Sequence, residues 1–223
     1  AMQHFCGTHK SRELEKVVDN ELIRRALSVF SVAEAEMKTR EGSKDNTSQV
    51  LLEGASLSNK SVFEAINLGS ANRAVGTMLS NELTQHFQQD AVPSTHPKLH
   101  FSFTGSVGQS FAAWLIKGVT FELCGDANDF VGKGLSGGRL ILRPQLAHHS
   151  DKPCEDEIAI DPRHNMIAGN VLLYGATSGT AFFYGSVADR FAVRNSGAHA
   201  VAEGAGDHAC GKSPLLVYNF NTF

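Results

Sequence analysis

Hydrophobic residues follow two different rhythms along this 223-residue chain, and the rhythm changes near residue 100. Over residues 11–30 the apolar positions recur at spacings of three and four residues, which predicts an amphipathic helix. Residues 73–87 show the same spacing and predict a second helix, whose apolar stripe we interpret as core packing. Between these helices, residues 40–60 form a polar connector and residues 62–67 predict a short strand.

Beyond residue 100, short apolar runs alternate with glycine. Seven runs predict strands: 100–105, 118–125, 137–144, 169–175, 179–185, 190–197 and 198–204. Glycines recur across them at intervals of 20 residues, as from Gly105 to Gly125 and from Gly118 to Gly138. A repeat of this length, made of short strands and tight turns, is typical of a solenoid. Only residues 109–117 hint at an intervening helix, so a doubly wound sheet with crossover helices is disfavoured.

The pattern as a whole predicts a mainly β fold, a parallel β-helix solenoid with an N-terminal helical segment. We assign residues 1–60 to the helical lead-in and linker and residues 61–223 to the β-helix, with 144–168 leaving it as a surface excursion. Glycine adopts the positive φ that tight corners need and other L-residues avoid. The glycines predicted to occupy structural turns are Gly105, Gly125, Gly132, Gly134, Gly137, Gly138, Gly175, Gly185, Gly197 and Gly204.

Composition and charge narrow the function classes. The chain is 42% hydrophobic with a net charge of −3, and it lacks the clustered basic face that nucleic acid or an anionic membrane surface requires. Its longest strongly apolar stretch, residues 111–116, is too short to span a bilayer. The first residues do not resemble a secretory signal, so we expect a cytoplasmic protein. Reduced thiols are expected for the four widely spaced cysteines, Cys6, Cys124, Cys154 and Cys210.

Two glycine-rich motifs overlap at the start of one predicted strand. Residues 132–137 match G-x-G-x-x-G, but a dinucleotide site needs a helix after the motif, and here a strand-like run follows. Residues 134–138 match G-x-S-x-G, which would make Ser136 the nucleophile of a hydrolase, with His199, Asp207 and His208 as nominal partners. The same strand disfavours this hydrolase, which stays a third alternative.

Other polar clusters carry weaker signals. Three possible zinc ligands lie within six residues near the N-terminus: His4, Cys6 and His9. A fourth ligand would have to come from His148, His149 or Cys154. Three arginines lie beside apolar runs, and for each of them we favour local pairing or bonding to turn carbonyls over contact with an anion or another domain: Arg73, Arg190 and Arg194. We therefore predict no catalytic, cofactor-binding or metal-binding residue in this chain.

Several stretches of the sequence together resemble the C-terminal glycine-rich domain of glutamate synthase large subunits, the GXGXG domain: residues 72–80, 103–111, 125–139, 169–179, 194–198 and 201–208. The resemblance is collinear from about residue 62 to residue 209, and residues 19–23 resemble the helical segment that precedes the domain. It implies a right-handed parallel β-helix. It also implies a parent enzyme that makes two glutamates from glutamine and 2-oxoglutarate.

In such an enzyme, a glutaminase domain releases ammonia and another domain, with FMN and an iron–sulfur cluster, uses it. The resemblance implies that the β-helix is a non-catalytic scaffold packed between these domains, with Asn72 and Arg73 as possible domain-interface residues. The implied partners are the other domains of the large subunit, and the small subunit or ferredoxin. A plastid location is implied if the source is a photosynthetic eukaryote.

A second reading is a stand-alone binding or assembly module, because glycine-rich β-helices of this kind also resemble a subunit of formylmethanofuran dehydrogenase. Residues 72–80 favour glutamate synthase. The sequence departs from the family after His208, where an apolar tail over residues 215–220 replaces further glycine-rich coils. We expect a β-helix truncated at this end, with a tail that covers the open edge or mediates self-association.

Overall fold

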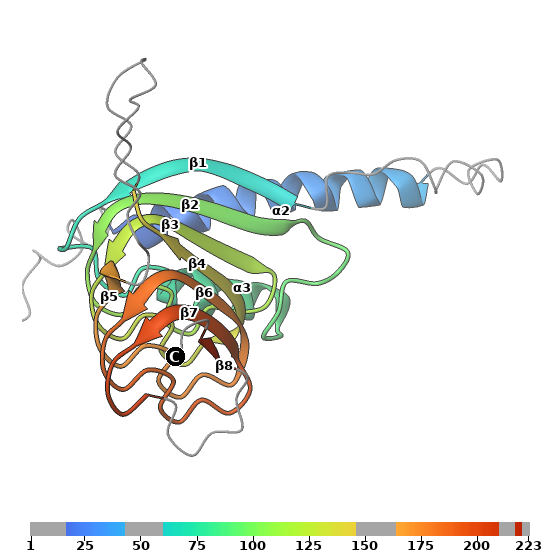
Figure 1. Cartoon of the computed structure of the whole chain (residues 1–223). Coiled ribbons are helices and arrows are strands. Elements are labelled where there is room, and N and C mark those ends of the chain that lie inside the picture. The colour runs from blue at the N-terminus through green and yellow to red at the C-terminus, as the bar shows by residue number, and fades with distance from the viewer. Residues whose placement is uncertain (1–16, 43–59, 146–163, 210–216, 220–223) are drawn as a thin grey trace, which may run out of the picture.

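The computed structural model describes residues 17–42, 60–145, 164–209 and 217–219, and within them the fold is mainly β (Figure 1). The strands form one parallel sheet in the order β1-β2-β3-β4-β6-β7-β8, and the short strand β5 pairs with β3 and β6. The elements are α2 (Val18–Gly42), β1 (Lys60–Leu68), α3 (Thr77–Phe87), β2 (Lys98–Val107), β3 (Val119–Ala127), β4 (Ser136–Arg143), β5 (Met166–Ala168), β6 (Ser178–Val187), β7 (His199–Ala205) and β8 (Val217–Asn219).

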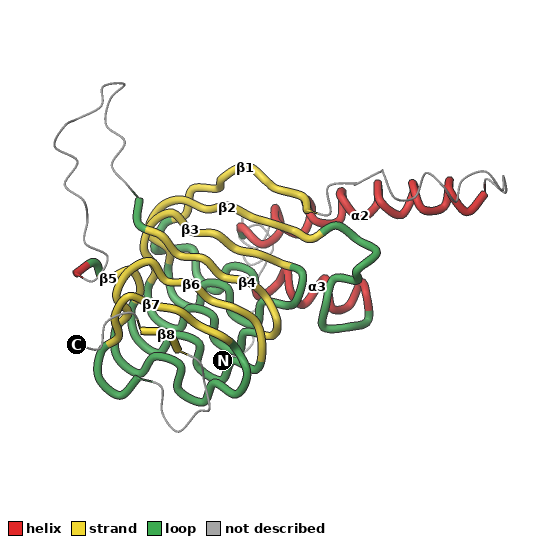
Figure 2. The backbone as a smooth tube through the Cα atoms, turned by 45° about the vertical axis from the view of Figure 1, so that its right-hand side comes forward, coloured by secondary structure: helices red, strands yellow, loops and turns green. Residues whose placement is uncertain are grey.

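The chain is built in layers, each made of a strand and the turn segment that follows it. Strands pair at the offset that the glycine spacing predicts: Leu99 of β2 lies beside Val119 of β3, 20 residues later. Figure 2 shows the strands stacked on one side of the molecule and the turn segments on another. The strands predicted around residues 62–67, 100–105, 118–125, 137–144, 179–185 and 198–204 are all present.

One layer is interrupted. Leu140 of β4 pairs with Ala181 of β6, 41 residues later, because about one extra repeat is inserted between β4 and β5. Strand β4 occupies the first part of this layer and β5 its last part, where Ala168 pairs with Ala127 of β3. The predicted excursion over 144–168 therefore ends before β5; residues 146–163 lie outside the described part of the chain.

The predicted strands at 169–175 and 190–197 are wrong, because these runs form turn segments. Every second residue in the four segments has positive φ, and most of these residues are not glycine: Ser110, Ala112, Trp114, Phe130, Gly132, Gly134, Val171, Leu173, Gly175, Arg190, Ala192 and Arg194. Within a segment, hydrogen bonds such as Leu135 N to Gly132 O close four-residue turns whose third residue has positive φ, as in type II turns.

Backbone hydrogen bonds also link each turn segment to the next. Gly132 N donates to Phe111 O, Leu173 N to Val131 O, and Ala192 N to Leu172 O. The positive-φ residues thus have their N–H groups satisfied between layers, as the sheet satisfies those of the strands. This bonding offsets the cost of placing side-chain-bearing residues in a left-handed conformation.

The core lies between the sheet and the turn segments. Inward side chains form ladders across the sheet, and one ladder loses volume from layer to layer: Phe101, Phe121, Leu140, Ala181 and Ala200. A second ladder also ends in alanine: Phe103, Leu123, Leu142, Phe183 and Ala202. Phe111 of the first full turn segment contacts Phe103 edge-on, with ring centroids 5.4 Å apart, so aromatic packing joins the two walls.

The two helices differ from their predicted bounds. Helix α2 extends to Gly42, well past the predicted end at residue 30, and its later half projects beyond the sheet in Figures 1 and 2. Helix α3 begins at Thr77 rather than residue 73, because Gly76 has a φ of 99° and residues 69–76 form turns. Residues 109–117 likewise form turns. Neither described helix combines the length and hydrophobicity that a membrane span requires.

Candidate functional site

Helix α2 covers the end of the stack where the sheet begins. Its residues Leu22, Ala26 and Phe30 recur every four positions, so they share one helix face, and all three are fully buried. They join the same core cluster as Leu79 and Leu83 of α3. The core at this end of the stack is therefore covered by a helix.

A buried carboxylate connects α2 to α3. Asp19, only 2% exposed, accepts hydrogen bonds from Gly76 N at 2.6 Å and Met78 N at 3.2 Å. These amides belong to the first turn of α3, whose N-cap residue Gly76 has no capping side chain of its own. Asp19 thus caps a helix that begins 58 residues further along the chain. Burial raises the pKa of the Asp19 carboxyl, and the two N–H donors oppose this effect only in part.

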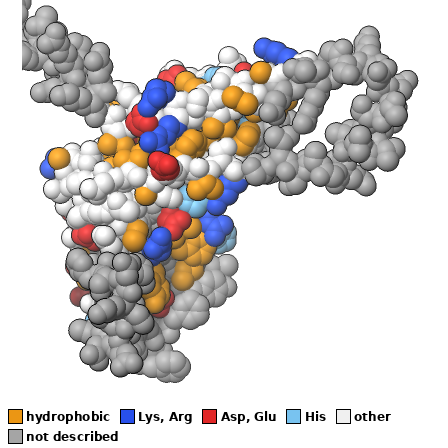
Figure 3. Space-filling model, turned by 90° about the horizontal axis from the view of Figure 1, so that it is seen from above, with side chains coloured by type: hydrophobic (Ala, Val, Ile, Leu, Met, Phe, Trp, Pro, Cys, Tyr) orange, Lys and Arg blue, Asp and Glu red, His pale blue; other side chains and the backbone are white. Residues whose placement is uncertain are grey.

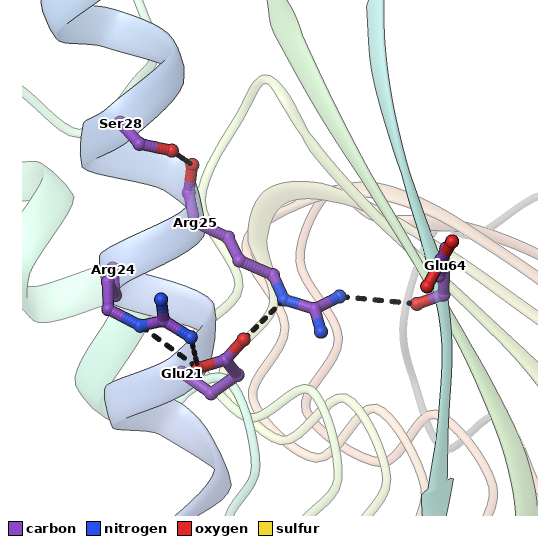
Figure 4. A network of polar contacts seen from close by, with 5 residues as sticks. All are labelled: Glu21, Arg24, Arg25, Ser28 and Glu64. Carbon is purple, nitrogen blue, oxygen red and sulfur yellow. Dashed lines mark hydrogen bonds and ion pairs between the residues drawn. The ribbon is translucent and has the colours of Figure 1, made fainter.

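A polar network lies on the opposite, exposed side of α2 (Figure 4). Glu21 pairs with Arg24 and, through Oε1, with Arg25 Nε at 2.6 Å. Arg25 also reaches across to β1 and donates to the backbone carbonyl of Glu64 at 3.4 Å. The pKa of the Glu21 carboxyl is lowered, first by the hydrogen bond from Arg24 and then by that from Arg25. The network ties α2 to the edge strand of the sheet.

The far end of the contact between α2 and the layers is aromatic. Phe30 lies edge-on to Phe87, with ring centroids 5.0 Å apart, and its ring is nearly parallel to that of His86. Glu34 Oε1 lies 3.4 Å from His86 Nε2 and 3.7 Å from His96 Nε2. The described residues contain no group of three His, Cys, Asp or Glu side chains arranged to hold a metal ion.

A groove follows the contact between α2 and β1. A cavity of about 510 Å³ opens there and is lined by Val17, Val18, Asn20, Glu21, Arg24, Arg25 and Ile66. Figure 3, which looks down on the molecule from above, shows hydrophobic side chains gathered between Lys or Arg and Asp or Glu side chains. Val62 of β1 is among the most exposed apolar residues of the described chain.

The turn segments form a second surface, which we name the aromatic–cationic face: Trp114, Phe130, Lys133, Tyr174 and Arg194. Lys133 Nζ lies 5.5 Å from the centroid of the Trp114 ring and 5.6 Å from that of Phe130. In the layer beyond, Arg194 lies over the ring of Tyr174 at 5.9 Å. A cation placed over an aromatic face in this way is attracted to the ring by the ring's quadrupole.

A cavity of about 340 Å³ lies between this face and α3. Trp114, Ile116 and Ser136 line one side, and the other carries Thr77, Ser80, Asn81, Thr84 and Asp90. The buried hydroxyl of Ser80 has no hydrogen-bond partner among the described residues.

The outer face of the sheet holds a third polar group, which joins three strands. Glu122 of β3 accepts from Arg143 Nε of β4 at 2.8 Å and lies 3.0 Å from His100 Nε2 of β2. The hydrogen bond from Arg143 is the main cause that lowers the pKa of the Glu122 carboxyl, and the contact with His100 acts in the same direction.

The glycines predicted at turns have two different roles. Gly132, Gly134 and Gly175 lie in turn segments with φ near +65°. Six lie within strands, where a side chain would meet the neighbouring layer: Gly105, Gly125, Gly137, Gly138, Gly185 and Gly204. At Gly125 an added Cβ would overlap the carbonyl oxygen of Gly105. At Gly197, just before β7, an added Cβ would also overlap the carbonyl oxygen of Thr177. Close approach between layers therefore requires these glycines, and positive φ adds to the requirement at Gly105, Gly125 and Gly137.

The predicted interface residues Asn72 and Arg73 lie at the end of the first layer. Asn72 Oδ1 accepts from Gly69 N at 2.9 Å, so its side chain supports the local turn. Arg73 is exposed. Neither residue belongs to the aromatic–cationic face, of which only Arg194 was considered as a contact residue from the sequence.

The hydrolase and dinucleotide-binding alternatives are not assembled. Ser136 Oγ donates to Gly134 O at 2.8 Å, and His199 lies two strands away on β7, so Ser136 is not paired with the histidine that the motif would need. The G-x-G-x-x-G motif leads directly into β4, not into a helix. The N-terminal His and Cys residues, His148, His149 and Cys154 lie outside the described residues.

A layered parallel sheet with stacked turn segments defines the class of protein, and sequence comparison gives the family. The family profile described as "GXGXG motif" matches residues 46–212. This chain belongs to that family, and its curated relatives are glutamate synthases. It is 49% identical over 63% of its length to "Glutamate synthase [NADH]" of Schizosaccharomyces pombe, 44% over 69% to "Glutamate synthase [NADPH] large chain" of Bacillus subtilis, and 41% over 68% to "Ferredoxin-dependent glutamate synthase" of Cyanidium caldarium. The matched part spans 6%, 9% and 9% of those relatives, respectively.

Proposed function

We propose that this chain is a non-catalytic scaffold domain of a glutamate synthase large subunit, which makes two glutamates from glutamine and 2-oxoglutarate. The observation that carries the proposal is the similarity to relatives whose names give three different electron donors, NADH, NADPH and ferredoxin. A segment shared among enzymes with different donors is best explained by a role that does not involve the donor. Continuous hydrogen bonding from layer to layer suits such a structural role.

We further propose that the layers wind as a right-handed parallel β-helix. Support comes from the parallel pairing of strands about 20 residues apart, because connections between adjacent parallel strands are right-handed in nearly all proteins. The scaffold would lie between the glutaminase domain and the domain that binds FMN and the iron–sulfur cluster, in the cytoplasm or in a plastid. The small subunit or ferredoxin would then be partners of the whole enzyme.

The described residues of this chain do not fit the two cofactors of the parent enzyme. An iron–sulfur cluster is generally held by several thiolates, and the described part of the chain contains one cysteine, Cys124. Cys124 is engaged with Arg143, whose Nη1 lies 3.4 Å from the sulfur. The glycine-rich motif that resembles a nucleotide site leads into a strand. We therefore assign both cofactors to other domains.

The proposal is tested with a chimera of the Bacillus subtilis large chain in which this chain replaces the matching segment. We expect the chimera, with its small subunit, to produce glutamate from glutamine and 2-oxoglutarate. The isolated chain, given the same substrates and an electron donor, should produce none. Glutamate made by the isolated chain, or a folded, cofactor-loaded chimera without activity, would overturn the proposal. The latter result would favour a stand-alone assembly module.

A further inference from the structure

The geometry points to the aromatic–cationic face as a docking surface for another domain of the same glutamate synthase polypeptide, one that presents carboxylates around an apolar patch. This inference rests on the proposed function and specifies which surface of the scaffold makes the contact. The face consists of side chains from successive turn segments, so its parts are held in a fixed relation by the hydrogen bonds between layers.

The composition of the face is that of a binding surface. Trp114 is the only tryptophan in the chain, and it is 48% exposed. Tryptophan, tyrosine and arginine are the residues most often found at the energetic centre of protein interfaces. Here Trp114, Tyr174 and Arg194 occur together, and the cations already lie over aromatic rings, which reduces the entropy lost on binding.

The neighbouring turn segment fixes the position of Trp114. Its φ is 54°, a left-handed value that is costly for a large side chain, and its N–H donates to Lys133 O at 2.8 Å. A Cβ on Gly134 would lie 2.5 Å from Trp114 Nε1, so the indole lies against the backbone where a side chain is missing. The ring is therefore positioned, and its outer side is left uncovered by the described residues.

The charged residues of the turn segments indicate which kind of partner surface the face would bind. The turn segments 109–114, 129–134, 171–175 and 189–194 contain three cations, Lys133, Arg190 and Arg194, and two carboxylates, Asp129 and Asp189. Both carboxylates are engaged within the stack: Asp129 Oδ1 accepts from Asn170 N, and Asp189 Oδ1 from Asp207 N. Asp90 lies in the wall of the adjoining cavity. A second copy of this chain would present the same cations, so self-docking through this face is disfavoured. A domain with exposed carboxylates is attracted.

We place the partner within the same polypeptide because the matched segment is a small part of the length of its relatives. The matched segment spans only 6–9% of the three relatives, so most of each relative consists of other parts of one chain. The cavity beside Trp114 adds a socket for a partner side chain, with the unpartnered Ser80 hydroxyl in its wall. An apolar anchor with a polar tip would fill it.

Hydroxyl-radical footprinting with mass spectrometry tests the inference on the chimera described above. Oxidation of Trp114 should fall about fivefold or more from the isolated chain to the chimera, because interface cores exclude water. Tyr184 on β6 is the internal control, since it is 49% exposed and lies on the sheet, away from the turn segments. Equal oxidation of Trp114 in both proteins would overturn the inference, whether or not the chimera makes glutamate. A functional chimera with unprotected Trp114 would leave the scaffold proposal intact.

Two substitutions separate docking from folding. Trp114→Gly removes the anchor and places at φ 54° the residue best suited to it, so the isolated chain should keep its melting temperature. In the chimera, the same variant should lower glutamate synthesis at least about threefold, the loss expected from one interface anchor. Tyr184→Ser should change neither quantity.

A charge-reversal pair completes the test. Lys133→Glu with Arg194→Glu should lower chimera activity and restore access of the radical to Trp114. Arg139→Glu is the matched control, because Arg139 also lies over an aromatic ring, that of Phe182 at 5.1 Å, but on the sheet. Equal losses from the charge-reversal pair and Arg139→Glu would mean general electrostatic disturbance and would overturn the inference.

Discussion

Removal of the Asp19 carboxylate should loosen the contact between α2 and the layers. In Asp19→Ala, the N–H groups of Gly76 and Met78 lose their acceptor at the start of α3. Loss of a cap costs about 1 kcal/mol, and a buried N–H left without a partner costs about 1–3 kcal/mol. Removing a buried charge returns part of this, so we expect a net loss of about 2 kcal/mol in the free energy of unfolding.

The assay is urea unfolding of the whole chain, followed by circular dichroism, with hydrogen exchange of the Met78 amide as the local readout. Glu21→Gln is the matched control, since it removes a carboxylate charge from the same turn of α2, where Glu21 pairs with exposed Arg24 and half-buried Arg25. Its loss of stability should be about 1 kcal/mol or less, smaller than that of Asp19→Ala. Unchanged stability and unchanged Met78 protection in Asp19→Ala would refute the capping role.

The direction of the pH dependence gives an independent check. Because the pKa of Asp19 is raised above its ordinary value of 3.8, the folded chain binds this proton more readily than the unfolded chain. Stability from this group therefore increases as the pH falls from above the folded pKa towards 3.8. Compared with Asp19→Asn, the wild type should gain stability on acidification. If the wild type instead loses stability on acidification relative to Asp19→Asn, the hydrogen bonds to Asp19 affect its pKa more strongly than burial does.

The remaining predictions concern the layers. Gly125→Ala should prevent folding or cost more than about 3 kcal/mol in the free energy of unfolding, because the added Cβ overlaps a carbonyl oxygen of the adjacent strand. Gly175→Ala should cost only about 1–2 kcal/mol for its positive φ, because no atom lies within 4 Å of the added Cβ. Thermal melts of the two variants compare these losses. Asn195→Ala should cost about 2 kcal/mol in urea unfolding, because this buried amide makes three hydrogen bonds to backbone groups of the following loop. Glu122 has a lowered pKa, so its contribution to the free energy of unfolding is present above its ordinary pKa of 4.5 and is lost as the pH falls through the pKa of the folded chain. The difference in stability between the wild type and Glu122→Gln should therefore shrink on acidification. A difference that grows would contradict the ion pair with Arg143.

The repeat and most strands could be predicted from the sequence because strand pairing at a fixed offset leaves a visible period. Strands such as β3 alternate buried and half-buried positions, which the apolar pattern records directly. The turn segments could not be predicted in the same way. Residues 169–175 have the composition of a strand, yet Val171 and Leu173 adopt positive φ, because bonding between layers overrides their local preference.

The candidate surfaces were harder to predict because they depend on contacts between distant segments. From the sequence, Asp19 is expected to cap its own helix. In the structure its carboxylate oxygens accept hydrogen bonds from the amides of Gly76 and Met78, nearly 60 residues further along the chain. Trp114, Lys133 and Tyr174 are ordinary residues in sequence and become neighbours only when successive turn segments stack. Two signals for this face were available in the sequence, the single tryptophan and Arg194 beside an apolar run.

The narrowing of the interior ladders has a mechanical consequence. Phe101 and Phe121 of β2 and β3 occupy the ladder that ends at Ala200 of β7, and Phe103 of β2 occupies the ladder that ends at Ala202, so both ladders end in small side chains. In a stack where each layer contacts mainly its neighbours, local stability should be lower at that end. We therefore expect fraying to begin at β7 and β8 and to proceed towards α2, whose end of the stack is the more stable one.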